Sequence, residues 1–190
     1  SLRKLGIYNS RIIENGVAVF NSASSYIPPK ELDRKEFILF LGRIVEKKGV
    51  FELICAFDLL KNTGSNLKLV MAGPVTGKMR RRLNGLSKFS SDIVFTGPAL
   101  GDLKWGLYEN TDVFVLPSYS EGQPIALLEA LAKGATCCAS KACGVNIELS
   151  RGRVIDNIVS KDIADGIVHC IGLKKNGFNI ERPSSVKSWG

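Results

Sequence analysis

The sequence predicts an α/β domain built on a Rossmann-like, doubly wound parallel sheet. Short and nearly continuous apolar runs predict strands that are buried on both faces, as in a parallel sheet. Stretches with helical spacing alternate with these runs, and each of the longer runs is followed closely by glycine or proline. Because parallel strands need right-handed crossovers, this alternation places helices on both faces of the sheet. The 190 residues are enough for one such domain.

The elements can be placed in order along the chain. Strands are expected at residues 37–41, 67–72, 93–95 and 113–116, with weaker ones at 136–139 and 154–155. Helices are expected at residues 50–61, 79–88, 103–110, 124–133 and 163–173. The fourth helix has the clearest limits, since Pro124 lies at its start and Gly134 just past its end. In doubly wound sheets ligands bind beyond the carboxyl ends of the strands, so the residues after each strand are the functional candidates.

The chain divides into three parts. We expect an N-terminal entry segment or linker at residues 1–35 and the Rossmann-like domain at residues 36–180. Residues 181–190 are expected to be a truncated C-terminal tail. The chain begins with Ser1, and we expect it to be a fragment of a longer protein. No stretch approaches the ~20 apolar residues of a membrane span, and no signal peptide is expected.

Composition and charge narrow the function classes. The content of 45% hydrophobic and 23% charged residues is typical of a globular protein and argues against a disordered chain. The net charge of +8 suits a phosphate-bearing ligand, an anionic membrane surface or nucleic acid, without choosing among them. Five cysteines with no Cys-x-x-Cys pair and a single histidine make a zinc site improbable, and free thiols in a reducing cytoplasm fit best.

The first candidate motif follows the first long strand and runs from Gly42 to Gly49. Arg43 can place two hydrogen bonds on a phosphate, and Lys48 supplies a mobile positive charge. Gly49 allows a close backbone approach where the next helix begins, and helix N-termini attract anions. The motif is therefore a candidate phosphate site, with a basic surface turn as the alternative.

The second candidate motif follows the fourth strand and spans residues 118–134. Glu121 lies in its loop, and Glu129 lies within an otherwise apolar helix. A carboxylate in such surroundings needs a partner. One interpretation is an ion pair with Lys133 at i+4, and the other is a carboxylate that accepts two hydroxyl groups of a ribose.

Together the two motifs resemble the nucleotide-sugar-binding half of the GT-B glycosyltransferases, in particular glycosyltransferase family 4, the glycosyl transferases group 1. The resemblance extends over residues 15–173 and rests on the order and spacing of several short motifs. The matching residues are Asn15-Gly16-Val17, Gly42-Arg43 with Lys48-Gly49, Asp112 to Ser118, Glu121 with Glu129, and Cys143 to Glu148.

The resemblance implies roles for individual residues. Arg43 and Lys48 would hold the donor diphosphate and stabilise it as it leaves, and Glu121 would contact the donor sugar; these three form the catalytic set. Glu129 would bind the ribose. The full donor-binding set is Gly42, Arg43, Lys48, Phe95, Thr96, Gly97, Glu121, Gly122, Gln123, Ile125, Ala126 and Glu129. The chain departs from the pattern at Pro124, where many members have glycine, so one backbone donor is lost there.

The resemblance also implies the reaction and the partners. The substrate would be a nucleoside-diphosphate sugar such as a UDP- or GDP-sugar, with no other cofactor, and the transfer would retain the anomeric configuration. No metal is expected, since the chain has no Asp-x-Asp motif. A glycan or lipid-linked acceptor would bind through a missing N-terminal domain, and the isolated domain would be nearly inactive. The expected context is polysaccharide or glycolipid synthesis in the cytoplasm, with a peripheral contact at the inner face of the membrane left open.

Two alternatives remain at this point. One is a nucleotide-sugar epimerase on the same fold, which needs additional acid and base groups. The other is a nucleic-acid- or membrane-binding module that uses the basic residues 78–82. A nucleic-acid partner is not expected, because no RNP-like or helix-turn-helix pattern is present. Dinucleotide binding is disfavoured, because Gly-x-Gly-x-x-Gly is absent after the first strand. The sugar, the base and the acceptor stay open.

Overall fold

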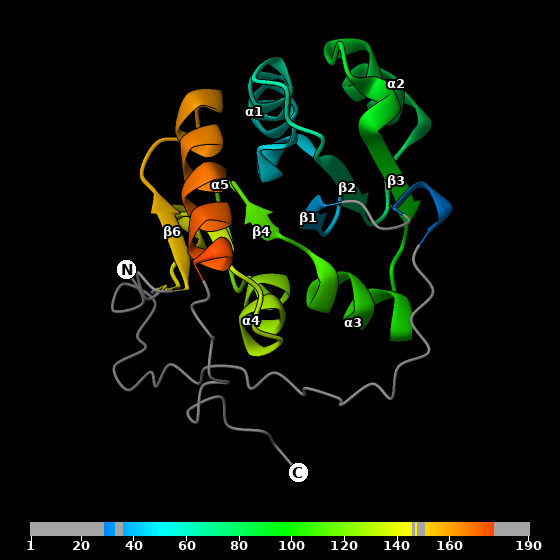
Figure 1. The fold of residues 1–190 in the computed structure, drawn as a ribbon. Coiled ribbons are helices and arrows are strands. Elements are labelled where there is room, and N and C mark those ends of the chain that lie inside the picture. Colours follow the sequence, from blue (N-terminus) through cyan, green and yellow to red (C-terminus); the bar gives the residue numbers. More distant parts are fainter. Residues whose placement is uncertain (1–28, 33–35, 146, 148–150, 177–190) are drawn as a thin grey trace, which may run out of the picture.

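The computed structural model describes residues 29–32, 36–145, 147 and 151–176. In these residues the chain forms a parallel sheet of six strands in the order β3-β2-β1-β4-β5-β6 (Figure 1). The strands are β1 (Phe37–Leu41), β2 (Lys68–Ala72), β3 (Ile93–Gly97), β4 (Val113–Leu116), β5 (Cys137–Ser140) and β6 (Gly152–Ile155). The predicted fold class is thus confirmed, and the two strands expected to be weak are both present.

Helices cover both faces of the sheet in a three-layer arrangement. They are α1 (Val50–Asn62), α2 (Gly77–Leu86), α3 (Gly101–Asn110), α4 (Ile125–Ala132) and α5 (Ser160–Lys175). Figure 1 shows α1, α2 and α5 on one face and α3 and α4 on the other. All five predicted helices are confirmed with small shifts at their ends. The start of α2 moves to Gly77 because the Thr76 side chain caps the helix and accepts a hydrogen bond from the Met79 N–H.

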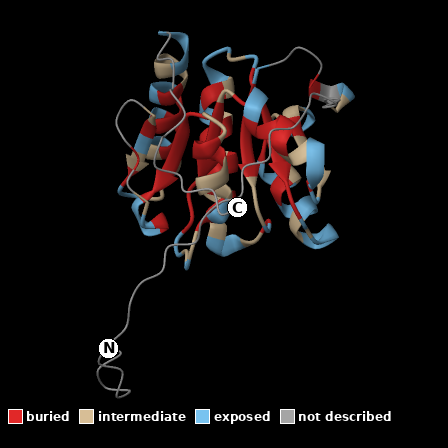
Figure 2. Cartoon of the chain, turned by 90° about the horizontal axis from the view of Figure 1, so that it is seen from below, coloured by how far each residue is buried: buried red, intermediate tan, exposed pale blue. Residues whose placement is uncertain are grey.

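The core lies on the two faces of the central strands. Ile38, Leu39 and Phe40 in β1 are completely buried, although they alternate between the two faces of the sheet. In Figure 2 the burial runs through the sheet and the inner sides of the helices, while the exposed residues lie on the outside. A strand enclosed in this way must be apolar throughout, which is why the continuous apolar runs in the sequence identified the sheet.

Some sequence predictions fall at the edges of the described residues. Lys30–Leu32 forms a short 3-10 turn, and Leu32 is buried in the core, so part of the predicted linker packs on the domain. The Asn15-Gly16-Val17 match, Glu148 and residues 181–190 lie outside the described residues. None of the described helices is long and apolar enough to cross a membrane.

The strand order fixes where the two motifs meet. β1 pairs with β2 on one side and with β4 on the other, so the chain order reverses between β1 and β4. The loops that follow β1 and β4 are therefore neighbours at the carboxyl edge of the sheet. This reversal point is where doubly wound sheets bind their ligands, and it brings together the two motifs that were singled out in the sequence.

Candidate functional site

The start of the loop after β1 is hydrogen-bonded to the end of β2 and to the loop that follows β2. The Gly42 N–H donates to the Ala72 carbonyl at 2.9 Å, and the Ile44 N–H donates to the Pro74 carbonyl at 3.0 Å. Arg43, between them, is exposed and forms no ion pair with any described residue. Its guanidinium is therefore presented from a well-held backbone and is open to an anionic ligand.

The same loop ends against the loop after β4. A short 3-10 turn, Glu46–Lys48, leads into Gly49, whose φ of 66° lies in the left-handed region that favours glycine. A Cβ atom on Gly49 would lie only 2.0 Å from the Pro117 carbonyl oxygen. The Tyr119 N–H also donates to the Lys47 carbonyl at 3.0 Å. The two loops thus pack together as one unit.

Two predicted catalytic residues are in direct contact within this unit. The Lys48 ammonium lies 2.5 Å from Oε1 of Glu121, and the Ser118 hydroxyl donates to the same oxygen at 2.6 Å. The side chains of Lys48 and Glu121 are only 16% and 7% exposed. Ser118 is itself buried, and its carbonyl accepts a hydrogen bond from the Ser140 hydroxyl at 2.5 Å. Glu121 is therefore held from two sides.

Pro124 shapes the backbone that leads into α4. Its φ of −84° and ψ of 69° are those of an inverse γ-turn, and the Ile125 N–H donates back to the Gln123 carbonyl at 3.0 Å. The Pro124 carbonyl accepts from the N–H groups of Leu127 and Leu128. The Ile125 N–H, which belongs to a residue of the predicted donor-binding set, thus already has a partner in its own chain. Gly122 and Ala126 lie in the same stretch, at the entrance of the helix.

Glu129 faces α3, and both its oxygens are engaged. Oε1 accepts from the Lys104 ammonium at 2.8 Å, and Oε2 accepts from the Tyr108 hydroxyl at 3.0 Å. Burial and the adjacent Glu129 carboxylate raise the pKa of Tyr108 well above its ordinary value, so this hydroxyl remains a donor. Lys133, the partner that the sequence suggested for Glu129, pairs with Glu109 at 2.7 Å instead.

Lys104 and Tyr108 were not predicted from the sequence to belong to the candidate site. They lie four residues apart, so they share one face of α3, but only the packing of α3 against α4 shows that this face meets Glu129. A carboxylate oxygen can accept more than one hydrogen bond. Glu129 therefore keeps the capacity to accept ribose hydroxyls, and its predicted role stays a prediction.

The residues predicted to flank the base lie at the same edge of the sheet, at the end of β3. Gly97 accepts a hydrogen bond through its carbonyl from the Gly73 N–H at 2.7 Å, and the Thr96 hydroxyl also donates to this carbonyl, at 2.9 Å. The Phe95 ring lies 5.0 Å from the Arg80 guanidinium. In the strand order β2 separates them from β1, so they lie to one side of the Lys48–Glu121 pair rather than in contact with it.

Potential metal ligands are dispersed, and most of the cysteine thiols are buried, in the described part of the chain. No group of three or more metal-ligating side chains occurs among the described residues. The five cysteines are free thiols. Burial raises the pKa of Cys137 and Cys143, and a hydrogen bond with Cys170 together with burial raises the pKa of Cys138, which makes these three poor nucleophiles.

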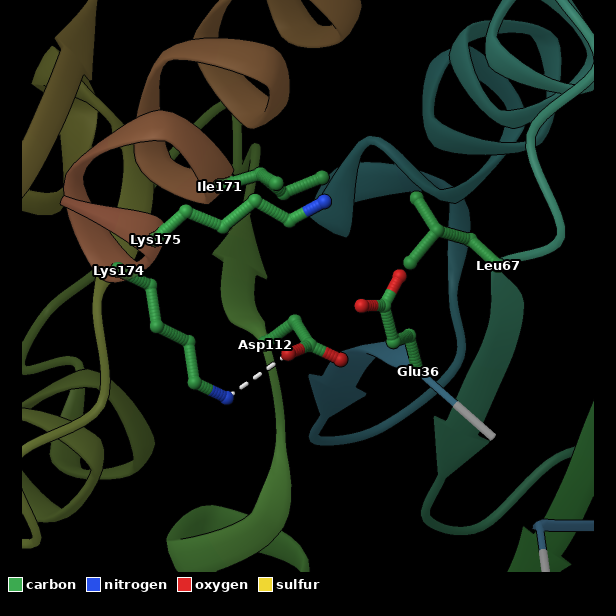
Figure 3. Close-up of a pocket in the computed structure, with 6 residues that line it drawn as sticks. All are labelled: Glu36, Leu67, Asp112, Ile171, Lys174 and Lys175. Carbon is green, nitrogen blue, oxygen red and sulfur yellow. Dashed lines mark hydrogen bonds and ion pairs between the residues drawn. The ribbon is translucent and has the colours of Figure 1, made fainter. Parts of the chain in front are cut away.

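A separate pocket lies at the opposite, amino edge of the sheet (Figure 3). Asp112 is its most connected residue. Its carboxylate accepts from the Phe37 N–H at 2.8 Å and from the Lys174 ammonium at 2.8 Å, and so joins the starts of β1 and β4 to the end of α5. Asp112 belongs to one of the matched motifs, but its contacts hold the fold together rather than face the switch point.

Comparisons with known proteins agree with this arrangement. The family model described as glycosyl transferases group 1 matches residues 26–182. The chain is 37% identical over 116 residues to an uncharacterized glycosyltransferase of Methanocaldococcus jannaschii, covering 60% of this chain and 29% of the relative. It is 29% identical to a lipopolysaccharide 1,2-N-acetylglucosaminetransferase of Salmonella typhimurium, covering 57% of this chain and 31% of that enzyme. The chain thus spans about a third of the length of these relatives.

A solved structure of a single domain matches the fold over most of that domain. The C-terminal domain of a glycosyl transferase group 1 family protein from Francisella tularensis superimposes with a TM-score of 0.63 at 24% identity, covering 76% of this chain and 83% of that domain. The fold is therefore that of the C-terminal half of a GT-B protein. With the family model matched over most of the chain, and with its two motifs joined at the switch point, the chain belongs to the glycosyl transferases group 1.

Proposed function

We propose that the chain is the donor-binding domain of a retaining glycosyltransferase that moves a sugar from a nucleoside-diphosphate sugar to an acceptor. The observation that carries the proposal is the contact between Lys48 and Glu121 at the switch point, with Arg43 exposed in the same loop. A candidate cation for the diphosphate, Lys48, thus lies against a candidate carboxylate for the sugar, and this contact supports the proposal. Membership of the glycosyl transferases group 1 supports a transferase over an epimerase.

The proposed chemistry follows from the charges. Breaking the bond between sugar and diphosphate leaves growing negative charge on the diphosphate and positive charge on the sugar. Arg43 and Lys48 would stabilise the first, and Glu121 would orient the sugar through its hydroxyl groups. Fixed charges aimed at the site where charge develops are the largest single source of catalysis in many enzymes. Glu129, within the helix α4 that follows the Glu121 loop, would bind the ribose.

We propose that the two cations take the place of a metal ion and that no cofactor is needed. Nucleotide binding should then be the same in EDTA and in Mn²⁺, because the protein supplies the positive charge. Calorimetry of a nucleoside diphosphate under both conditions is the test. Binding that appears only with the metal would overturn this part of the proposal.

The acceptor is proposed to be a glycan or a lipid-linked glycan, bound through a domain outside this chain. One relative, 34% identical over 119 residues, is named as a transferase acting on a diphospho-undecaprenol-linked sugar. The exposed cations Arg80, Arg81 and Arg82 on α2 would suit a peripheral contact with the anionic inner face of a membrane. Co-sedimentation with phosphatidylglycerol vesicles and with RNA would decide between a lipid and a nucleic-acid surface.

The central experiment measures binding of UDP, GDP and ADP by calorimetry to the wild-type chain and to Arg43→Ala. Loss of a charge-assisted contact should weaken the nucleotide that binds about 10- to 100-fold. Arg153→Ala is the matched control, because Arg153 is also exposed but lies on the far edge strand β6. Equal affinity of the two variants would refute the assignment of the diphosphate to the loop after β1.

A further inference from the structure

We infer that Glu121 is the resting counter-ion of Lys48 and that a donor must displace it, so that this ion pair discriminates a nucleoside-diphosphate sugar from the nucleoside diphosphate left after transfer. The inference rests on the proposed function and adds a specificity device to it. The inference is based on Lys48: this cation, which we propose binds the diphosphate, already has a partner in Glu121.

The contact between the two side chains is close and sheltered. Lys48 and Glu121 approach to 2.5 Å, and both side chains are largely buried. An ion pair withdrawn from solvent in this way is screened less than a surface pair. Ser118 stabilises the same carboxylate oxygen at 2.6 Å and so favours the paired position. The positive charge of Lys48 is therefore neutralised within the protein before any ligand arrives.

A diphosphate cannot simply be added to this pair. Its oxygens would approach the ammonium from beside the Glu121 carboxylate, and two anions in a sheltered site repel each other. The diphosphate therefore competes with Glu121 for Lys48. Arg43 differs in this respect, because it pairs with no described residue and need not give up a partner.

The backbone next to Glu121 allows the carboxylate to turn away. Gly122 follows it directly and is exposed, and a Cβ atom at this position would meet nothing within 4 Å. The loop is fixed on the other side of Glu121, where the Tyr119 N–H binds the Lys47 carbonyl. The contacts between the two packed loops, Tyr119 with Lys47 and Gly49 with Pro117, therefore do not involve the Glu121 side chain.

The sugar of the donor can compensate for the cost of breaking the Lys48–Glu121 pair. A carboxylate freed from Lys48 can accept hydrogen bonds from sugar hydroxyls, and hydrogen bonds to a charged acceptor are strong. A nucleoside diphosphate without a sugar offers no such donor, so Glu121 returns to Lys48 and weakens the hold on the diphosphate. The same exchange favours release of the product once the sugar has been transferred.

The test uses inorganic pyrophosphate, which does not depend on the unknown base, and calorimetry on the 190-residue chain. Glu121→Gln should bind pyrophosphate about tenfold more tightly than the wild type, because Lys48 is released. Glu46→Gln is the matched control: it removes one negative charge from the loop after β1, but Glu46 has no ion pair with Lys48. It should change the affinity little.

A double-mutant cycle isolates the pair from general charge effects. In a Lys48→Met background, Glu121→Gln should no longer tighten pyrophosphate binding. Glu121→Asp, which shortens the side chain and keeps its charge, should also release Lys48 and gives a second readout if the Gln variant folds poorly. Unchanged or weaker binding by the Glu121 variants, or tightening that equals that of Glu46→Gln, would overturn the inference.

The specificity is tested by comparing UDP, GDP and ADP with UDP-glucose, GDP-mannose and ADP-glucose. Glu121→Gln should tighten the diphosphate that binds but not its sugar conjugate, so the preference for the conjugate falls. Equal tightening of both would overturn the discrimination. Failure of the proposed function is recognised separately, since Arg43→Ala would then leave pyrophosphate affinity unchanged whatever Glu121 does.

Discussion

The backbone of Gly49 lies directly against the carbonyl of Pro117. A Cβ atom built on Gly49 would be 2.0 Å from the Pro117 oxygen and 3.2 Å from its ring. This contact joins the end of the loop after β1 to the start of the loop after β4. It lies next to the Lys48–Glu121 pair along the chain, since Lys48 precedes Gly49, and Ser118, which donates to Glu121, follows Pro117. The site geometry thus depends on a glycine that has no side chain to offer a ligand.

Gly49→Ala should therefore destabilise the protein and disturb the site together. A left-handed residue other than glycine costs about 1–2 kcal/mol, and the clash with Pro117 should bring the total loss of unfolding free energy to about 3 kcal/mol or more. Urea denaturation measures this loss. Gly64→Ala is the control, because Gly64 also has a positive φ, 84°, but no atom within 4 Å of the added carbon. An equal loss at both positions would show that the Pro117 contact is unimportant.

The strands could be predicted from the sequence because a sheet covered on both faces has no polar positions to interrupt the pattern. Phe37–Leu41 and Val113–Leu116 are apolar at nearly every residue, and their carboxyl ends had to lie at one edge once the strands were parallel. The place of the two motifs followed from this rule. The ends of the helices were less certain, since a side chain such as Thr76 can shift the start of a helix by two residues.

The partners of the site residues could not be predicted, because they come from segments distant in sequence. A pair with Lys133 at i+4 was one of two interpretations of Glu129, but its carboxylate is turned toward Lys104 and Tyr108 of α3. The Lys48–Glu121 contact joins residues 73 positions apart. Each motif predicted its own chemistry, while the pairing depended on how closely the loops pack, and the sequence carries no direct sign of that except Gly49.

Asp92→Asn should reduce stability at neutral pH and lose its effect in acid. Asp92 accepts from Lys68 at 2.6 Å and pairs with Lys61 at 2.8 Å, and these contacts hold the pKa of Asp92 below its ordinary value of 3.8. A lowered carboxyl pKa stabilises the fold above the ordinary value, and the contribution disappears as the pH falls through the lowered one. The almost buried Lys68 would lose its ion pair in the variant and keep only the Ser91 carbonyl as acceptor, at a cost of about 2 kcal/mol at pH 7.

The check on Asp92 is chemical denaturation of both proteins between pH 7 and pH 3. The difference between their unfolding free energies should shrink below about pH 4, as the wild-type carboxyl takes up its proton. Asp165→Asn serves as the control, because its pair with Lys161 is 65–78% exposed and solvent screening leaves such a pair with little effect on stability. A difference that stays constant down to pH 3 would argue against the Lys61 and Lys68 contacts as the source of stability.

Glu129 is expected to bind the ribose hydroxyl groups, while Lys104 and Tyr108 hold its carboxylate in position. Glu129→Gln replaces a charged acceptor by an amide, one of whose two groups can only donate. The variant should bind the preferred nucleoside diphosphate about tenfold more weakly, while its affinity for pyrophosphate stays unchanged, because pyrophosphate has no ribose. Tyr108→Phe keeps the ring in the core and removes only the hydroxyl bound to Oε2, so it should produce a smaller loss of the same kind.

The comparison of the two ligands separates a ribose contact from a purely structural ion pair. Glu109→Gln is the matched control, since Glu109 also joins α3 to the end of α4, through Lys133 at 2.7 Å, and has no place in the proposed site. A structural role for Glu129 would lower the unfolding free energy in both variants and leave the ratio of nucleoside-diphosphate to pyrophosphate affinity unchanged in both. The ribose role requires that ratio to fall in Glu129→Gln and Tyr108→Phe alone. Weaker binding of pyrophosphate in Glu129→Gln would instead place its carboxylate against the phosphates and move the ribose elsewhere.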